Sequence, residues 1–461
     1  MYDNSTIAAI STPLGEGGIG IVKISGNESF NITKKIFHCR ESKKSGYPAP
    51  RYLYHGYIKD EENRIVDEVL TSFMPAPKTY TREDIVEINC HSGIFALRTI
   101  LKIVINSGAR LAEPGEFTRR AFLNGRIDLS QAEAVINIIR ARSEEAVRTA
   151  ARVLSGGLTE KIENIRSELI NLRAPIEAML DYPEEYDYDK PDLLKLNEKL
   201  LVIHKNINDL LKGVEVSRVY QNGVNIAIVG QPNVGKSSLL NALLRQQKAI
   251  VHETPGTTRD LLEGYMNLGG YPLRLVDTAG IQGTEDPVEK EGIARSRNAA
   301  REARLLLMVL DGSIGWSAFD TGIADLKEEY QGLVVVINKA DLEQKITPVE
   351  VNNKIPDASV VKTVATRGEG IDALELAVAE QLDRVLGSAP ESPVIVTLRQ
   401  EEILTDALLI IDDTLEALYK QPLEIISSEM QRLWMKLGEI TGATMNGDLL
   451  DKVFSEFCLG K

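Results

Sequence analysis

The first group of residues that could do chemistry lies in one glycine-rich run. Gly230-Gln-Pro-Asn-Val-Gly-Lys-Ser237 fits the pattern G-x-x-x-x-G-K-[ST] and follows an apolar segment. In such a run the glycines let backbone N–H groups approach phosphate oxygens, the lysine supplies positive charge at the β- and γ-phosphates, and the serine hydroxyl is a ligand for Mg²⁺. We therefore expect a nucleoside triphosphate to bind at Asn233, Val234, Gly235, Lys236, Ser237 and Ser238, with Lys236 catalytic and Ser237 on Mg²⁺.

Two further loops have the composition and position expected beside the phosphates. Asp277-Thr278-Ala279-Gly280 follows a second apolar run, so Asp277 could hold Mg²⁺ through water and Gly280 could sense the γ-phosphate. The hydroxyl-rich run Val251 to Asp260 lies where a first switch loop belongs, with Thr258 as a Mg²⁺ ligand. The residues of this loop that we expect at the nucleotide are His252, Glu253, Thr254, Pro255, Gly256, Thr257 and Thr258.

The base is predicted to be guanine. Asn338-Lys339-Ala340-Asp341 follows another apolar run. A carboxylate at its last position can accept two hydrogen bonds from the N1–H and the exocyclic amine of guanine, a pair that adenine cannot donate. An ATP-using enzyme is therefore a weaker interpretation than a GTP-hydrolysing one.

The residue after Gly280 narrows the mechanism. Many GTPases place a glutamine there to orient the attacking water, whereas this chain has Ile281. Because an apolar side chain cannot orient water, another residue must do so. The developing charge must also be stabilised by a bound cation or by a group from a partner.

The elements that must position these motifs are short apolar runs between helical segments. The runs are 226–229, 273–276, 305–310 and 333–337. Strand, loop and helix in repetition are typical of a doubly wound, mostly parallel α/β sheet. Amphipathic helical periodicity flanks this region on both sides, and an α+β pattern precedes it. The predicted organisation is an α+β domain (1–118), a helical domain in two parts (119–218 and 381–461) and an inserted P-loop GTPase domain (219–380).

Composition limits the class of protein. The chain has 461 residues, of which 43% are hydrophobic and 26% charged, with a formal net charge of -14. Such an acidic chain is not expected to bind nucleic acid over its whole surface, although the composition leaves room for a local basic patch. The three cysteines lack the spacing of a zinc site or a disulfide framework. No apolar run is long enough for a membrane span and no targeting segment is evident, so we expect a cytoplasmic protein.

Three blocks outside the GTPase motifs carry a resemblance to a known family. They are Ile7 to Gly20 (IAAISTPLGEGGIG), Pro114 to Glu133 (PGEFTRRAFLNGRIDLSQAE) and Phe457 to Lys461 (FCLGK). With the GTPase motifs, they make the chain resemble the MnmE (TrmE) family of bacterial tRNA modification GTPases, among the potassium-activated TrmE-Era-EngA-like GTPases. The resemblance implies that GTP hydrolysis, with an FAD-containing partner, adds a carboxymethylaminomethyl group to C5 of the wobble uridine of certain tRNAs.

The resemblance also implies roles for residues that have no evident chemistry by themselves. It places K⁺ at Asn233, His252, Thr254 and Thr257, and makes Glu289 the general base or the residue that orients water. It gives the amino-terminal domain a folate-binding fold that binds a reduced folate, 5,10-methylene- or 5-formyl-tetrahydrofolate. The matching folate-binding positions are Lys23, Glu87, Arg126 and Lys461, while Cys458 is expected to be buried or merely close to the folate.

The implied assembly is a homodimer formed through the amino-terminal domain. It would join an FAD-containing partner of the MnmG (GidA) type in a heterotetramer that acts on tRNA. The chain departs from the family at Val364-Ala365-Thr366, where the family has Ser-Ala-Lys, so the guanine contact expected there is the backbone N–H of Ala365. A different function, a regulatory GTPase switch in ribosome assembly without folate chemistry, stays open, and folate binding distinguishes the two.

Overall fold

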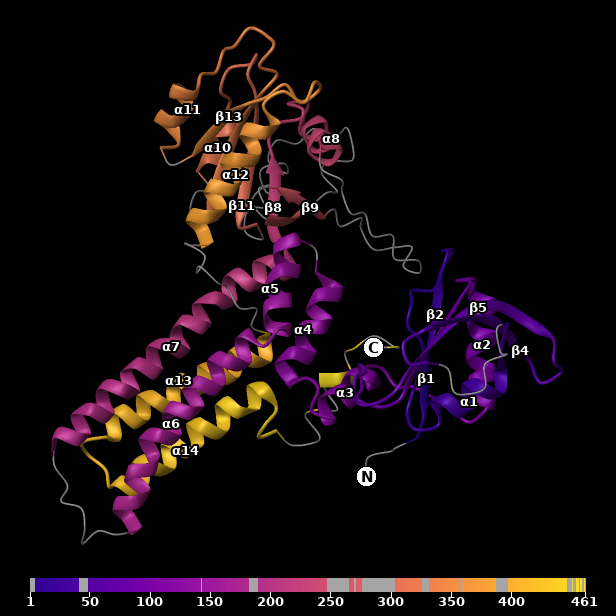
Figure 1. Ribbon diagram of the computed structural model, residues 1–461. Helices are drawn as coiled ribbons and strands as arrows, with labels where there is room; N and C mark the ends of the chain where they lie inside the picture. The colour runs from indigo at the N-terminus through magenta and orange to yellow at the C-terminus, as the bar shows by residue number, and fades with distance from the viewer. Residues whose placement is uncertain are drawn as a thin grey trace. The chain divides into compact units, whose positions relative to one another are not determined.

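The protein is seen in a computed structural model (Figure 1). The structure describes residues 5–40, 49–141, 143–181, 190–246, 265–268, 271–275, 303–325, 331–356, 358–386, 397–445, 450, 453–455, 457 and 460. The chain divides into two compact units. The first comprises Met1–Ile136, Thr159–Ala174 and Met430–Lys461, and the second comprises Asn137–Leu158 and Pro175–Glu429.

A seven-stranded sheet organises the first unit, in the order β3-β4-β5-β6-β2-β1-β7. Its neighbouring strands pair antiparallel, except that β1 and β7 are parallel. The strands are β1 (Ile7–Ile10), β2 (Gly20–Ser25), β3 (Phe37–Cys39), β4 (Leu53–Lys59), β5 (Ile65–Met74), β6 (Ile85–Cys90) and β7 (Arg110–Leu111). The helices α1 (Ser29–Ile36) and α2 (Ile94–Asn106) lie in the same part of the chain.

The core against this sheet is formed by residues that alternate along the strands and recur every three to four positions on the helix. Alternate residues of β2 and β6 are buried because successive strand side chains point to opposite faces. On α2, Leu97, Ile100 and Val104 are spaced three and four residues apart, so they share one helix face and are fully buried. These side chains join one hydrophobic cluster. The strands and helices of this region agree with the α+β pattern that the sequence predicted.

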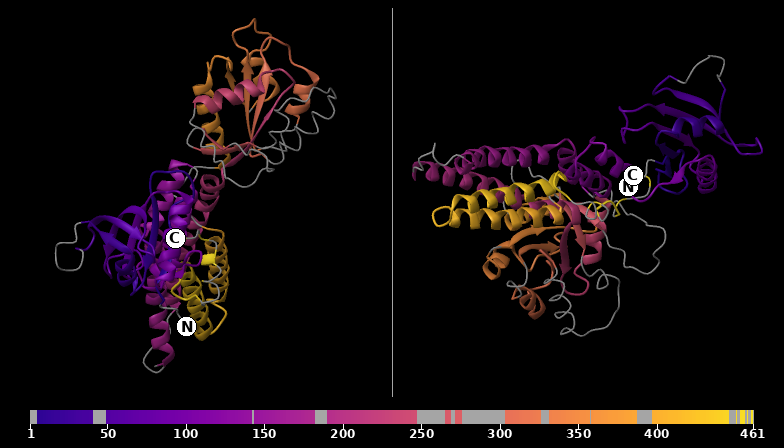
Figure 2. Two further views of the ribbon diagram at one scale, coloured as in Figure 1. Left: turned by 90° about the vertical axis from the view of Figure 1, so that its right-hand side faces the viewer. Right: turned by 90° about the horizontal axis from the view of Figure 1, so that it is seen from below.

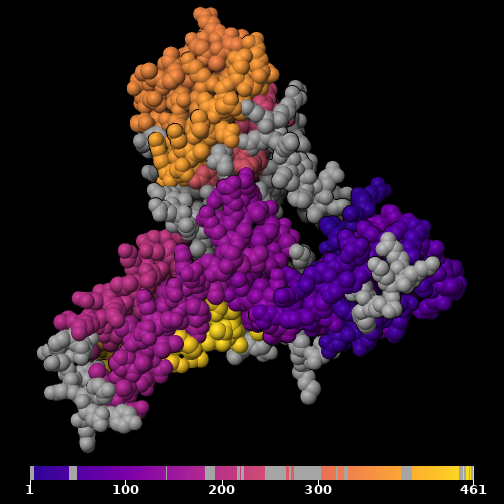
Figure 3. Space-filling view, viewed as in Figure 1, coloured from indigo at the N-terminus to yellow at the C-terminus, as the bar shows by residue number. Residues whose placement is uncertain are grey.

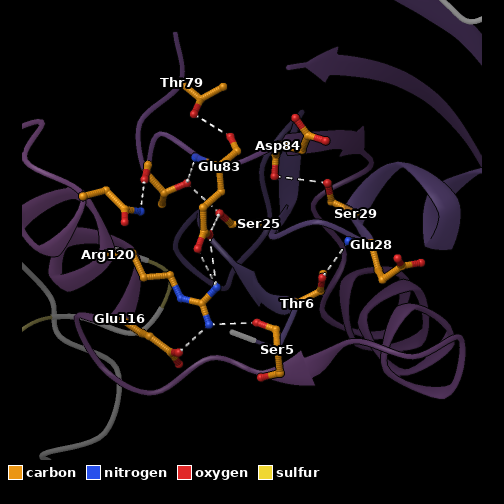
Figure 4. Close-up of polar contacts among 12 residues, drawn as sticks. Ser5, Thr6, Ser25, Glu28, Ser29, Thr79, Glu83, Asp84, Glu116 and Arg120 are labelled. Atoms are coloured by element: carbon orange, nitrogen blue, oxygen red, sulfur yellow. Dashed lines mark hydrogen bonds and ion pairs between the residues drawn. The ribbon is translucent and has the colours of Figure 1, made fainter. Parts of the chain in front are cut away.

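A buried ion network joins α3 (Glu116–Leu123) to the sheet (Figure 4). The guanidinium of Arg120, 1% exposed, donates to Glu83, to Glu116 and to the backbone oxygen of Ser5. Glu83 also accepts a hydrogen bond from Ser25 on β2. Because removing one partner from a buried network leaves the others uncompensated, these contacts fix α3 against the sheet.

The carboxyl-terminal segment packs on residues from the beginning of the chain. Phe454 and Phe457 share a hydrophobic cluster with Ala121 and Leu129, and the yellow segment lies against the purple one in Figure 3. Further along, the hydroxyl of Ser11 donates to the backbone oxygen of Gly460 over 3.1 Å. The first unit is therefore built from both ends of the sequence.

A six-stranded sheet organises part of the second unit, in the order β13-β12-β11-β8-β10-β9. All neighbouring strands are parallel except β9, which pairs antiparallel with β10 at one edge. The strands are β8 (Val224–Val229), β9 (Tyr265–Leu268), β10 (Tyr271–Leu275), β11 (Leu305–Asp311), β12 (Gly332–Asn338) and β13 (Ser359–Lys362).

Helices cover both faces of this sheet. One face packs against α8 (Lys236–Gln246) and α12 (Ile371–Leu386), and the other against α10 (Ala318–Ala324) and α11 (Pro348–Lys354). Every residue of β11 and β12 is consequently buried, which explains why these strands are continuous apolar runs. The predicted doubly wound, mostly parallel sheet is confirmed.

Long helices precede and follow this sheet in the sequence. The helix α7 (Lys190–Asn222) leads into β8, and α13 (Leu398–Ala417) follows α12. The two run side by side (Figure 2), with an ion pair of 3.3 Å between His204 and Asp412. The α/β domain is thus inserted into a helical domain, as predicted, while the boundaries at residues 118, 218 and 380 stay predictions. The structure also describes α4 (Leu129–Arg140), α5 (Glu144–Leu154), α6 (Gly157–Asp181) and α14 (Leu423–Thr441). In the described part of the chain, no helix is long and apolar enough to span a membrane.

Candidate functional site

The phosphate loop links the end of β8 to the start of α8. Its backbone takes left-handed conformations at Asn233, with φ 62°, and at Gly235, with φ 102°. A Cβ atom on Gly235 would lie 2.2 Å from Nδ2 of Asn338, so no side chain fits there. The glycine is required both by its backbone angle and by the close approach of Asn338.

Two side chains hold the loop in shape. Nζ of Lys236 donates to the backbone oxygens of Gly230 and Gln231, each over 2.7 Å, and burial lowers the pKa of this lysine. The amide of Gln231 donates to Ser317 and Asp320, which form the capping box of α10. The loop is therefore tied to a neighbouring helix as well as to its own lysine.

Asn338, at the end of β12, ties the phosphate loop to the segment after β13. Its side chain is buried, and its Nδ2 donates to the backbone oxygen of Val234 over 2.9 Å. Its Oδ1 accepts hydrogen bonds from the hydroxyl of Thr363 and the backbone N–H of Ala365, each over 3.1 Å. Three segments that are distant in sequence thus meet at one amide.

Lys339 has a partner at the end of the neighbouring strand. Its Nζ lies 2.6 Å from Oδ2 of Asp311. Burial alone would raise the pKa of Asp311, but hydrogen bonds from Lys339 and Ser313 outweigh it and lower that pKa. The pair fixes the path of the lysine stem, which lines the pocket described next.

A pocket of about 190 Å³ opens where these segments converge. Its lining comes from the phosphate loop and α8, from the segment after β12 and from the segment after β13. The lining residues are Gly235, Ser238, Asn338, Lys339, Asp341, Leu342, Val364, Ala365 and Thr366. Carboxyl ends of parallel strands meet at one sheet edge, which is where α/β proteins of this class bind ligands.

The structure brings together part of the predicted nucleotide site. It places Gly235, Ser238, Asn338, Lys339, Asp341 and Ala365 around the pocket, and Asn233, Val234, Lys236 and Ser237 in the adjoining loop and helix start. The expected residues that lie outside the described part of the chain are His252, Glu253, Thr254, Pro255, Gly256, Thr257, Thr258, Asp277, Thr278, Ala279, Gly280 and Glu289.

A second cluster in the first unit gathers three of the four residues predicted to bind folate. Lys23 on β2 faces Glu87 on β6 in the strand register, with 3.8 Å between their charged atoms. Nζ of Lys23 lies 5.6 Å from the ring centre of Tyr80, and the guanidinium carbon of Arg126 lies 4.7 Å from the same ring. Lys461 and Cys458 lie outside the described residues.

Tyr80 was not among the residues predicted from the sequence. Its hydroxyl is 3.0 Å from that of Thr118, and burial raises the pKa of its phenol. Two cations within reach of one aromatic ring are a favourable arrangement that depends wholly on the fold. Only the polar run before β6 hints at it, and such runs are common in loops.

Comparison with known proteins agrees with this architecture. A family model described as "GTP-binding protein TrmE N-terminus" matches residues 6–126, and one described as "MnmE helical domain" matches residues 129–458. Curated relatives named "tRNA modification GTPase MnmE" match over their whole length. That of Alkaliphilus oremlandii is 43% identical over 100% of both chains, and that of Carboxydothermus hydrogenoformans is 45% identical over 99% of both. That of Bacillus subtilis (strain 168) is 43% identical over 99% of this chain and 100% of its own. The chain therefore belongs to the MnmE family of tRNA modification GTPases.

Proposed function

We propose that the protein hydrolyses GTP and, together with an FAD-containing partner of the MnmG type, adds a carboxymethylaminomethyl group to C5 of the wobble uridine (position 34) of certain tRNAs. One observation carries the GTPase part. The phosphate loop, Asp341 and the segment after β13 line a single pocket at the carboxyl edge of a parallel sheet. The modification chemistry rests on the full-length similarity to MnmE relatives.

Guanine would enter the pocket with its N1–H and exocyclic amine directed at Asp341. Asn338 is committed to three contacts within the protein. We therefore assign it the role of shaping the pocket. The backbone N–H of Ala365 donates to Asn338 in this structure, so it would share its single hydrogen with the base if it contacts the base in this pocket.

Lys236 would carry positive charge to the β- and γ-phosphates, and Ser237 would bind Mg²⁺. The side chain of Ser237 is exposed at the first turn of α8, where backbone N–H groups favour anions. The side chain of Asn233 is exposed on a left-handed turn of the same loop, so its carbonyl oxygen is available to K⁺. Thr258 for Mg²⁺, His252, Thr254 and Thr257 for K⁺, and Glu289 for orienting water remain part of this proposal.

A reduced folate would bind at the cluster around Tyr80. The carboxylates of a folate tail suit Lys23 and Arg126, and Glu87 can accept hydrogen bonds from pterin N–H groups. The exposure of the two side chains is compatible with folate binding, because Lys23 is 14% and Glu87 is 32% exposed, so both are partly shielded and still accessible. We include Lys461 in the site by family position.

Exposed apolar residues on the first unit support a homodimer formed through this unit. Phe95, at the start of α2, is 85% exposed, and Ile19 is 67% exposed. The loop before Ile19 is joined to this helix start, because the backbone N–H of Gly17 donates to Ser92 over 2.7 Å. Exposed apolar residues that are gathered in this way favour a protein partner. We propose that the dimer associates with the FAD-containing partner as a heterotetramer and acts on tRNA in the cytoplasm.

GTP turnover in KCl and in NaCl tests the GTPase proposal. We expect hydrolysis that is faster in K⁺, and Asp341→Asn should shift purine preference from guanine toward xanthine, because an amide can donate to the C2 oxygen of xanthine. Equal turnover of GTP and ATP by the native chain would refute guanine recognition.

The tRNA part has its own experiment. Mass analysis of wobble nucleosides from a strain that lacks this protein should show loss of the C5 group, restored by the native gene. Unchanged nucleosides, together with no binding of reduced folate in calorimetry, would favour a regulatory GTPase instead.

A further inference from the structure

The segment after β13 forms a turn that sets the position of residue 367. The backbone N–H of Val364 donates to the oxygen of Glu369 over 3.0 Å, and the N–H of Arg367 donates to the oxygen of Val364 over 2.9 Å. Gly368 and Gly370 take left-handed angles of 74° and 80°. The turn is therefore closed by its own backbone, which sets the place of residue 367 relative to the segment after β12.

This turn places Arg367 next to the carboxylate that lines the pocket. Nη2 of Arg367 lies 3.5 Å from Oδ2 of Asp341, and the two side chains are 62% and 29% exposed. Thr366, the preceding residue, is itself part of the pocket lining. The ion pair thus lies at the rim of the pocket, and the interior of the pocket remains open to a base.

Two other polar side chains of the pocket, those of Asn338 and Lys339, are engaged elsewhere. Asn338 bonds to Val234, Thr363 and Ala365, and Lys339 pairs with Asp311. The side chain at position 364 is valine, which is buried and has no hydroxyl to offer Asp341. Among the described residues, Arg367 is a cation that the structure places next to this carboxylate, and its Nη1 also lies 4.0 Å from Oε1 of Glu369.

We infer that Arg367 is a positioning residue for purine specificity, which holds the Asp341 carboxylate in the orientation that accepts the N1–H and exocyclic amine of guanine. This inference rests on the proposed GTPase function. A carboxylate has about four lone-pair sites, so Oδ2 can face the guanidinium and still accept a hydrogen bond from the base. The two roles of Asp341 are therefore compatible in one geometry.

The test compares the affinity of the full-length chain for GDP and for inosine diphosphate, which lacks the exocyclic amine. Arg367→Ala should weaken GDP binding about two- to fivefold, the effect expected for an exposed ion pair. The affinity for inosine diphosphate should change less, so the preference for GDP narrows. Arg367→Lys should restore part of that preference, and the difference between the native chain and Arg367→Ala should shrink as KCl concentration rises, because salt screens exposed charges.

Arg384→Ala is the matched control, since Arg384 is an exposed arginine on α12 of the same domain. A GDP affinity of Arg367→Ala equal to that of Arg384→Ala would overturn the inference, and so would an equal loss for GDP and inosine diphosphate. In an Asp341→Asn background, measured with xanthosine diphosphate, Arg367→Ala should have no effect; an unchanged effect there would also overturn it. If the native chain bound no GDP at all, the GTPase proposal itself would fail, which is a different result.

Discussion

Asn338→Ala is the substitution that most directly tests the construction of the pocket. It removes one hydrogen bond to Val234 and two from Thr363 and Ala365. Each hydrogen bond contributes about 0.5 to 1.5 kcal/mol net, so their loss should cost roughly 1.5 to 4.5 kcal/mol of local stability. The segment after β13 should then open more often, even in the absence of nucleotide.

Hydrogen–deuterium exchange of the nucleotide-free, full-length chain measures this opening locally. We expect the peptide spanning residues 359–368 to exchange roughly ten- to a thousandfold faster in Asn338→Ala. Thr363→Val removes one of the three hydrogen bonds, so it should have a smaller effect on the same peptide. GDP affinity should fall in the same order, since the disturbed segment lines the pocket.

One result would refute this reasoning. If Asn338→Ala weakened GDP binding but left the exchange of residues 359–368 unchanged, Asn338 would act on the nucleotide alone. The three hydrogen bonds of Asn338 within the protein would then contribute nothing measurable to local stability.

Three further predictions concern the glycine of the phosphate loop, the buried network and a surface histidine. Gly235→Ala should reduce GDP affinity at least about tenfold in a fluorescent-nucleotide titration. A left-handed backbone costs roughly 1 to 2 kcal/mol for alanine, and the methyl group would lie 2.2 Å from Asn338. A near-native GDP affinity would contradict this steric clash. Arg120→Met should destabilise the first unit by roughly 3 to 5 kcal/mol, because it leaves Glu83 without its buried partner. In a Trp316→Phe background, Trp434 fluorescence reports the unfolding of this unit, and Arg120→Lys should lower the free energy of unfolding less than Arg120→Met does. His91 should titrate by NMR with a raised pKa, since its ring bonds to Asp67, and Asp67→Asn should lower it; the stabilising contribution is present below the unfolded pKa and is lost as pH rises through the folded pKa.

The motifs proposed to bind phosphate and base could be recognised in the sequence because each is local. The motifs that contain Lys236 and Asp341 begin directly after apolar runs, and the carboxyl ends of parallel strands must converge at one edge. The insertion of the sheet between helical segments was predictable for a similar reason, because the hydrophobic period changes near β8 and again after α12.

The contacts that complete the sites could not be predicted because they join residues distant in sequence. The hydrogen bond from Asn338 to Val234 spans 104 residues. The placement of Tyr80 close to two cations depends on strand register and on the path after α3. The pairing of Arg367 with Asp341 depends on a turn whose closure is a backbone property. Patterns within a single sequence do not report such long-range neighbours.

The docking of the carboxyl-terminal residues on the amino-terminal sheet has a consequence for biosynthesis. Ser11 and Gly460 are 449 positions apart. A ribosome that adds about 5 to 20 residues per second needs on the order of 20 to 90 seconds between them. During this interval the chain around Ser11, just after β1, lacks its carboxyl-terminal cover, whereas the contiguous inserted sheet can fold as soon as it emerges. Chaperone capture should therefore concentrate on the early segment, although that segment is synthesised first.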